Sequence, residues 1–187
     1  MKKCRVCRQP FEPRQPMQAV CGVACAKELA ASIRGKAEKQ AAIKQRRADR
    51  ERKERLKTRR DWEKEAQTAF NAFIRARDKD MPCICCGLPL SAGDVGGAYD
   101  CGHYRSVGSA PHLRFHEDNA HAQRKQCNRW GAGRAVDYRL GLIARIGLAR
   151  VEALEADQSP RKYTADELRV IRDLYRAKLR ELEATHA

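Results

Sequence analysis

The residue types that could carry chemistry gather in one segment of the chain, between Cys83 and Asn128. In order, the segment contains a Cys-x-x-Cys pair, a histidine, an asparagine and a Cys-Asn dipeptide: Cys83 and Cys86, His103, Asn119, and Cys127 with Asn128. Thiolates bind zinc, a neutral imidazole can take a proton from water, and amide or carboxylate oxygens bind hard cations such as Mg²⁺. Together these groups suit a zinc-stabilised site that holds a second metal against a phosphodiester.

The zinc ligands of this segment are incomplete in sequence. The Cys-x-x-Cys pair and the distant Cys127 supply three thiolates, but the expected fourth position, three residues before Cys127, is Arg124, which does not bind zinc. The remaining candidates for the fourth ligand are His121, Cys101 and Cys85. We favour His121, because a neutral imidazole would complete an ordinary Cys3His site. The alternative is a segment that binds no metal and is held by packing alone.

A second group of cysteines opens the chain. It consists of two closely spaced pairs: Cys4 and Cys7, then Cys21 and Cys25. Two such pairs about a dozen residues apart are typical of a tetrahedral Cys4 zinc knuckle. The knuckle could serve only to fold the N-terminus, or it could present its basic neighbours to DNA or a partner. With nine cysteines mostly in close pairs and no signal peptide, metal binding is favoured over disulfides, and we expect a cytoplasmic protein.

The charge of the chain points to a polyanionic partner. Its 39 Lys and Arg outnumber 24 Asp and Glu, for a net charge of +15. Residues 26–60 hold 14 of the basic and 5 of the acidic residues, so the excess is clustered, whereas a role in solubility alone would not require clustering. Nucleic acid is the expected partner, and no apolar run approaches a membrane span. The candidate DNA contacts are Arg46, Arg47, Arg50, Lys53, Arg105 and Arg124.

Long helices are expected to carry these groups. From Ala26 to about Arg60 only Gly35 is a poor helix former, and apolar residues are too sparse for a coiled coil, so we predict a solvated basic helix. From Asp61, apolar residues recur at helical spacing: Trp62, Ala66, Ala69, Phe70, Phe73 and Ile74. This spacing predicts an amphipathic helix with a buried face. It should end around residues 78–80, because Pro82 disfavours helix at the residue before it.

The rest of the chain predicts one short strand and two more helices. Residues 99–104 read as a strand that carries Asp100 and His103. An amphipathic helix is expected from Val136 toward Leu154, with Gly147 as a weak point, and Thr164 with Glu167 forms a capping box that begins another. The fold class is therefore mainly α with small zinc-stabilised β elements. We divide it into an N-terminal zinc knuckle (1–28), a basic helical linker (29–60) and a domain with the catalytic residues and flanking helices (61–187).

The order of the central motifs resembles a known superfamily. Cys83-x2-Cys86, Gly102-His103-Tyr104 and Asn119-x3-Gln123-x3-Cys127-Asn128 resemble the HNH, or ββα-metal, endonucleases, and more closely the NinG (Rap) recombination proteins of lambda-type phages. The likeness extends over nearly the whole chain. Its further motifs are Phe11 and Pro13, Asn71-Ala72-Phe73-Ile74-Arg75, Leu113-Arg114-Phe115, Tyr138-Arg139 and Arg145-Ile146-Gly147.

The resemblance implies a metal-dependent phage endonuclease that cuts branched DNA, such as Holliday junctions and strand-invasion intermediates. It assigns His103 as the general base and Asn119 as the residue that orients the base and its loop. Asp100 and Asn128 would bind one Mg²⁺ or Mn²⁺, while zinc at the cysteines is structural. The partners would be branched or duplex DNA, other phage recombination proteins and, since a junction offers two symmetric strands, a second copy of the chain.

Two departures from the family pattern and two rival functions remain open. Arg124 replaces the usual cysteine, and residues 129–134 lack the Ser-Gly-Asn ending of many relatives. One rival is a non-catalytic zinc protein that binds DNA as a recombination accessory. The other is a zinc protein that binds RNA or the ribosome, which would share the charge and the knuckles but cut nothing.

Overall fold

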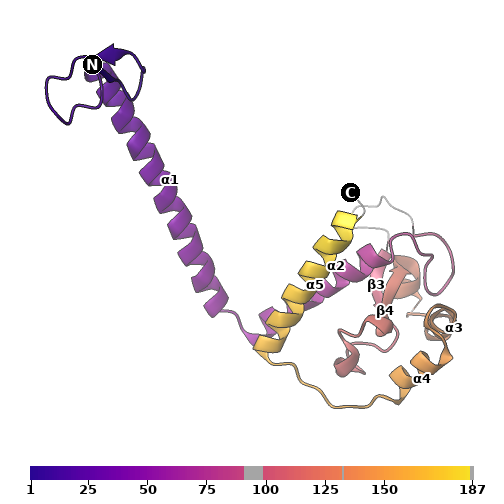
Figure 1. The fold of residues 1–187 in the computed structure, drawn as a ribbon. Coiled ribbons are helices and arrows are strands. Elements are labelled where there is room, and N and C mark those ends of the chain that lie inside the picture. The colour runs from indigo at the N-terminus through magenta and orange to yellow at the C-terminus, as the bar shows by residue number, and fades with distance from the viewer. Residues whose placement is uncertain (91–98, 132, 186–187) are drawn as a thin grey trace. The chain divides into compact units, whose positions relative to one another are not determined.

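The computed structural model describes residues 1–90, 99–131 and 133–185. The chain forms two compact units, Met1–Leu56 and Lys57–Ala187. In these described ranges, each unit contains one two-stranded antiparallel sheet, and helices make up most of the rest (Figure 1). The expected class, mainly helical with small β elements, is confirmed. Within the described residues, no helix is both long and apolar enough to cross a bilayer.

The first unit is a small cysteine-containing hairpin followed by a long helix. Strand β1 (Lys2–Lys3) pairs with β2 (Pro10–Phe11), and α1 (Val23–Arg55) follows. Gly35 does not interrupt the helix, and no residue of α1, all of which is described, is buried. The helix is therefore solvated, as predicted. It ends at Arg55, five residues before the expected Arg60, because a capping box at Thr58 begins the next helix.

A capping box separates α1 from the amphipathic helix α2 (Arg59–Arg77). The Asp61 amide donates to Thr58 Oγ1 at 3.3 Å, and the Thr58 amide donates to Asp61 Oδ2 at 2.9 Å. These bonds satisfy amide groups that a helix N-terminus otherwise leaves without partners. The basic and amphipathic segments are thus two helices, and α2 ends before Asp78, in the predicted place.

The last helix, α5 (Ala165–Thr185), packs along α2. Phe70 and Tyr175 meet edge to face with their ring centroids 4.8 Å apart, and Trp62, Phe73 and Leu168 share the same core. The predicted Thr164–Glu167 capping box is present at the start of α5. The C-terminal helix therefore packs against the helix that carries Trp62.

A small sheet lies between two helical layers of the second unit. Strand β3 (Tyr99–His103) pairs antiparallel with β4 (Ala120–Arg124), so that His103 lies opposite Ala120 and Asp100 opposite Gln123. Cys101 and Ala120 belong to the core on the α2 side. On the other face, the Tyr138 hydroxyl of α3 donates to the Gly102 carbonyl at 2.9 Å. Because side chains alternate along a strand, His103 shares the α2 face, while Asp100 and Gln123 share the α3 face.

Two short helices cover that second face. Helices α3 (Ala135–Ile146) and α4 (Leu148–Ala156) meet at Gly147, whose φ of 85° ends the first helix at the predicted weak point. Their core consists of Ile84, Ala110, Leu113, Tyr138, Leu142, Val151 and Leu154. Single turns of 3-10 helix, η1 (Pro111–Leu113) and η2 (Glu117–Asn119), lie between the strands, and the short π-helix η3 (Gln126–Trp130) follows β4.

Candidate metal centres and catalytic residues

The four N-terminal cysteines form one group. The sulfurs of Cys4, Cys7, Cys21 and Cys25 all lie within 4.8 Å of one another. The hairpin supplies the first two, and Cys25 comes from the first turn of α1, so the group joins the hairpin to the helix. Four thiols at this spacing can hold a tetrahedral zinc ion. The expected knuckle ligands are therefore brought together.

A second group consists of three thiols of the second unit. The sulfurs of Cys83, Cys86 and Cys127 lie within 4.8 Å of one another. The Cys83 carbonyl accepts from the Gly87 amide at 3.0 Å, and the φ of 67° at Gly87 closes this turn. Cys127 comes from η3, immediately after β4. Three of the predicted ligands of the second zinc thus converge.

Cys83 and Cys127 differ in acidity. The Cys85 side chain and the backbone amide of Arg124 stabilise the Cys83 thiolate and lower its pKa to about 4. Burial, with Cys86 beside it, raises the pKa of Cys127 to about 11. A zinc ion at this group must therefore displace a proton from Cys127, and its divalent charge can do so.

The structure does not bring the predicted fourth ligand to this group. Among the described residues, His121 is not one of the side chains that cluster with the three sulfurs. It lies on the α3 face of β4, with its ring centroid 6.4 Å from that of Tyr138, and its Nδ1 is buried without a hydrogen-bond partner. Burial lowers the His121 pKa to about 3. The prediction of a Cys3His site was wrong because strand alternation directs this imidazole into the core.

The other two candidates do not join the group either, although Cys85 contacts Cys83. Cys85 Sγ accepts from Gln123 Nε2 at 2.8 Å. Cys101 is buried on the α2 face of β3, where burial raises its pKa to about 12. In the part of the chain that the structure describes, the second thiol group therefore has three protein ligands.

His103 is held in one orientation at the end of β3. Its Nε2 lies 3.1 Å from the carbonyl oxygen of Arg114, and Phe70 lies against the ring with centroids 6.0 Å apart. A carbonyl group can only accept, so Nε2 carries the proton and Nδ1 keeps a lone pair. Burial lowers the His103 pKa below its usual value. A neutral imidazole with Nδ1 available has the form that a general base requires.

Asn119 fixes the loop between the two strands. Its Oδ1 accepts from the Arg105 amide at 2.8 Å, and its Nδ2 donates to the carbonyls of Arg105 and Leu113. Its side chain is 0% exposed. Because all its contacts are with backbone, Asn119 positions the loop that follows His103. The predicted role of Asn119 in orienting the base and its loop stays a prediction.

Asp100 and Asn128 come together, but with a third partner. Asn128 Nδ2 donates to Asp100 Oδ2 at 3.1 Å, and Arg129 binds both carboxylate oxygens at 2.8 and 3.0 Å. Desolvation opposes ionisation of Asp100, but Arg129 and Asn128 outweigh it and lower its pKa. The two predicted ligands of the catalytic metal thus meet on the face of β3 opposite His103. Sequence reasoning did not include Arg129, because an arginine beside a carboxylate is not apparent until the π-helix places it there.

The six predicted DNA contacts separate into three groups. Arg46, Arg47, Arg50 and Lys53 lie on α1, within its solvated basic segment. Arg105 is directed inward instead and donates to the Glu155 carbonyl at 2.8 Å, at the C-terminal end of α4. The prediction that Arg105 contacts DNA disagrees with this geometry, because helix-end carbonyls without partners attract a guanidinium.

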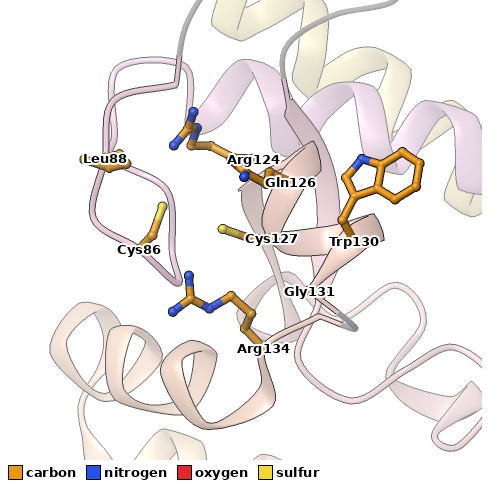
Figure 2. Close-up of a pocket in the computed structure, with 8 residues that line it drawn as sticks. All are labelled: Cys86, Leu88, Arg124, Gln126, Cys127, Trp130, Gly131 and Arg134. Atoms are coloured by element: carbon orange, nitrogen blue, oxygen red, sulfur yellow. The ribbon is translucent and has the colours of Figure 1, made fainter.

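Arg124 lines a cavity beside the second thiol group. The cavity has a volume of about 460 Å³ and includes Cys86 and Cys127 in its wall (Figure 2). Trp130 and Arg134 also line it, and neither was singled out from the sequence. Trp130 is 84% exposed, which is unusual for so large an apolar side chain. The sequence signal available for Trp130 was its position directly after Cys127-Asn128-Arg129.

The family model and the curated relatives that match this chain all belong to one family. The family model described as "Bacteriophage Lambda NinG protein" matches residues 1–185. The chain is 41% identical to "Protein ninG" of Escherichia phage 933W over 192 residues, which cover 97% of this chain and 93% of that protein. It is 46% identical to the protein of that name from Salmonella phage P22, and 45% to that of Escherichia phage lambda, each over 127 residues that cover 68% of this chain and 60% of the relative. No solved structure matches the chain significantly.

Proposed function

Because the chain belongs to the NinG family of bacteriophage recombination-related proteins, we propose that it is a metal-dependent endonuclease that cuts branched DNA. The observation that carries the proposal is the state of His103. Its Nε2 proton is committed to the Arg114 carbonyl, so Nδ1 remains as a base, and burial keeps the ring neutral at cellular pH.

The order of elements around His103 supports an HNH-type arrangement. His103 ends β3, Asn119 directly precedes β4, and the Tyr104 amide donates to the Asn119 carbonyl at 2.8 Å. Asn119 therefore helps to close the loop between the strands at its base, through both its backbone and its side chain. This closure holds His103 at a fixed place, which is what a base must have relative to the water it activates.

Asp100 and Asn128 are the proposed ligands of the catalytic ion. Their oxygens are hard donors of the kind that Mg²⁺ and Mn²⁺ prefer. An ion bound there would neutralise negative charge on the scissile phosphate and the leaving oxygen. Asp100 and His103 are three residue steps apart along β3, about 10 Å at ~3.3 Å per step. In this proposal His103 takes a proton from water, while Asp100 holds the metal ion that contacts the phosphate.

The basic surface of α1 is proposed to hold the DNA backbone. Arg46, Arg47, Arg50 and Lys53 offer a sequence-independent grip, which suits an enzyme that selects DNA by its branching. Such an enzyme would work in the bacterial host cell beside other phage recombination proteins. We expect two copies at a four-way junction, because the junction presents two symmetric strands.

One observation favours a second candidate, a DNA-binding recombination accessory without nuclease activity. Arg129 already satisfies both oxygens of Asp100, and this pair could serve only to fasten η3 to β3. An accessory protein would bind junctions through the same basic surface and cut nothing. The two candidates differ in whether a divalent metal leads to cleavage.

The test is cleavage of a labelled four-way junction and a matched linear duplex, with Mg²⁺ or Mn²⁺ and with chelator. Wild type is compared with His103→Ala and with His116→Ala, an exposed histidine of the same loop. We expect metal-dependent cutting of the junction by wild type and His116→Ala, and none by His103→Ala. Tight junction binding without cutting by wild type would support the accessory function instead.

A further inference from the structure

The second thiol group leaves one side of a metal ion open. Zinc takes four ligands in a tetrahedron at about 2.3 Å from sulfur, which requires sulfurs about 3.8 Å apart. The sulfurs of Cys83, Cys86 and Cys127 lie within 4.8 Å of one another, which is close enough for three of these four ligands. No side chain of the described residues joins them as a fourth. Cys86 and Cys127 face the cavity of about 460 Å³ described above (Figure 2).

We propose that these three cysteines bind a zinc ion whose fourth coordination position opens into this cavity and accepts a phosphate oxygen. Three protein ligands with an open position are the pattern of zinc sites that bind an exogenous ligand, whereas structural sites are closed by four protein ligands. The N-terminal group of the same chain, with four thiols, is an example of the closed kind.

The position of Arg124 explains why the site is open. Its backbone amide donates to Cys83 Sγ at 3.3 Å, so the backbone of Arg124 lies beside the thiol group, where a cysteine would offer a fourth thiol. The arginine side chain is too long to close the site and extends into the cavity wall instead (Figure 2). A basic side chain thus stands where the fourth ligand would be.

Charge supports an anionic ligand. Three thiolates and Zn²⁺ carry a net charge of −1, which by itself would repel phosphate. Arg124 and Arg134 line the cavity on either side of Cys86 and Cys127 (Figure 2), and with Asp137 paired to Arg134 their combined charge of +1 offsets that charge. Arg134 Nε donates to Asp137 at 2.7 Å, which fixes the guanidinium at the cavity. Arginine also matches the geometry of phosphate oxygens.

The experiment replaces zinc by Co²⁺ in the full-length chain and follows its visible spectrum. Two Co²⁺ ions per chain are expected, one in each thiol group. Adding inorganic phosphate should change the spectrum of one Co²⁺ and saturate at one equivalent. Arg134→Gln should bind Co²⁺ as wild type does but require at least tenfold more phosphate. The readout is ligand binding, so its result does not depend on whether the protein cuts DNA.

Arg124→Cys is the decisive variant. It should convert the second group into a Cys4 site that holds Co²⁺ with a spectrum insensitive to phosphate. The proposal is overturned if wild type binds one Co²⁺ only, if neither inorganic phosphate nor a 5′-phosphorylated oligonucleotide changes its spectrum, or if Arg124→Cys responds as wild type does.

The source of the phosphate is resolved by a second pair of titrations. A short oligonucleotide with a 5′-phosphate is compared with the same oligonucleotide ending in a 5′-hydroxyl. A response to the phosphorylated strand alone assigns the position to a DNA end, and a response to inorganic phosphate alone assigns it to the free ion. Either result supports the open site, and no response to any of the three ligands contradicts it.

Discussion

The imidazole of His103 is fixed by two contacts that act in different ways. The Arg114 carbonyl selects the tautomer, and the apolar surroundings, with Phe70 against the ring, disfavour the charged form. Both effects leave Nδ1 unprotonated over a wider pH range than in a solvated histidine. Sequence reasoning found the residue, but neither contact is visible in the chain order, since Phe70 and Arg114 are 44 positions apart.

The first prediction concerns the pH dependence of cleavage. The base must be neutral, and burial lowers the pKa of His103, so activity should rise with pH through a value below 6.5 and then level off. The measurement is kcat/KM for junction cleavage across the acid range, with the metal concentration held constant. An acid limb centred at or above 6.5 would show that His103 is not the base.

A second prediction concerns Arg129. Its guanidinium, with a side chain 58% exposed, competes with a divalent ion for the oxygens of Asp100. Arg129→Ala should therefore strengthen Mn²⁺ binding several-fold, because both oxygens are released while Asn128 stays in place. Calorimetric Mn²⁺ titration measures it, with Asp100→Asn as the variant that should lose binding. Weaker binding in Arg129→Ala would favour a fastening role for the ion pair.

At the scale of elements, the approach of α3 to the second cysteine turn decides where that turn lies. A β-carbon added at Gly141 would stand 1.8 Å from the carbonyl oxygen of Ile84, so only glycine permits this contact. Gly35 of α1, by contrast, has open space around it. Both glycines lie within helices, yet replacing them by alanine should have opposite effects on stability.

This contrast gives a third prediction. Gly35→Ala should stabilise α1 by about 0.5–1 kcal/mol, the usual helix preference of alanine over glycine. Gly141→Ala should destabilise the second unit by about 1–3 kcal/mol, because α3 must move away from Ile84. Hydrogen exchange resolved by peptide measures both: slower exchange in α1 for the first variant, and faster exchange in the Cys83–Gly87 turn for the second. Equal effects in both variants would refute the close approach.

At the scale of the whole molecule, charge and folding are divided between the two units. The first unit has a solvated helix with a strong basic excess, and its compact part is centred on four thiols. The second unit holds the two hydrophobic cores. The proposed contacts with the DNA backbone and the proposed chemistry therefore belong to different units of one chain.

A fourth prediction follows from this division. Replacing Arg46, Arg47, Arg50 and Lys53 together by glutamine should weaken binding to junction and duplex alike, because phosphate contacts carry no structural preference. If all four contact phosphate, the log-log salt slope should become less negative by about 3–4. Fluorescence anisotropy across a salt series measures it. A loss of junction binding alone, with the same salt slope, would assign these residues to branch recognition.

The sequence by itself determined the features that depend on local spacing. The cysteine pairs, the helical periodicity from Trp62 to Ile74, the Thr164–Glu167 capping box and the break at Gly147 all follow from residues close in the chain. The order of the motifs, through the family resemblance, also indicated that His103 precedes a loop and that Asn119 ends it.

Only the tertiary structure decided which distant side chains meet. Strand register puts His121 in the core instead of at the zinc ligands, directs Asp100 to the face opposite His103, and brings Arg129 to Asp100. The tertiary structure also decided that Arg105 points inward and that the second thiol group faces a cavity. The physical reason is that pairing one strand with another fixes the face of every side chain at once, and no spacing within a single segment specifies that pairing.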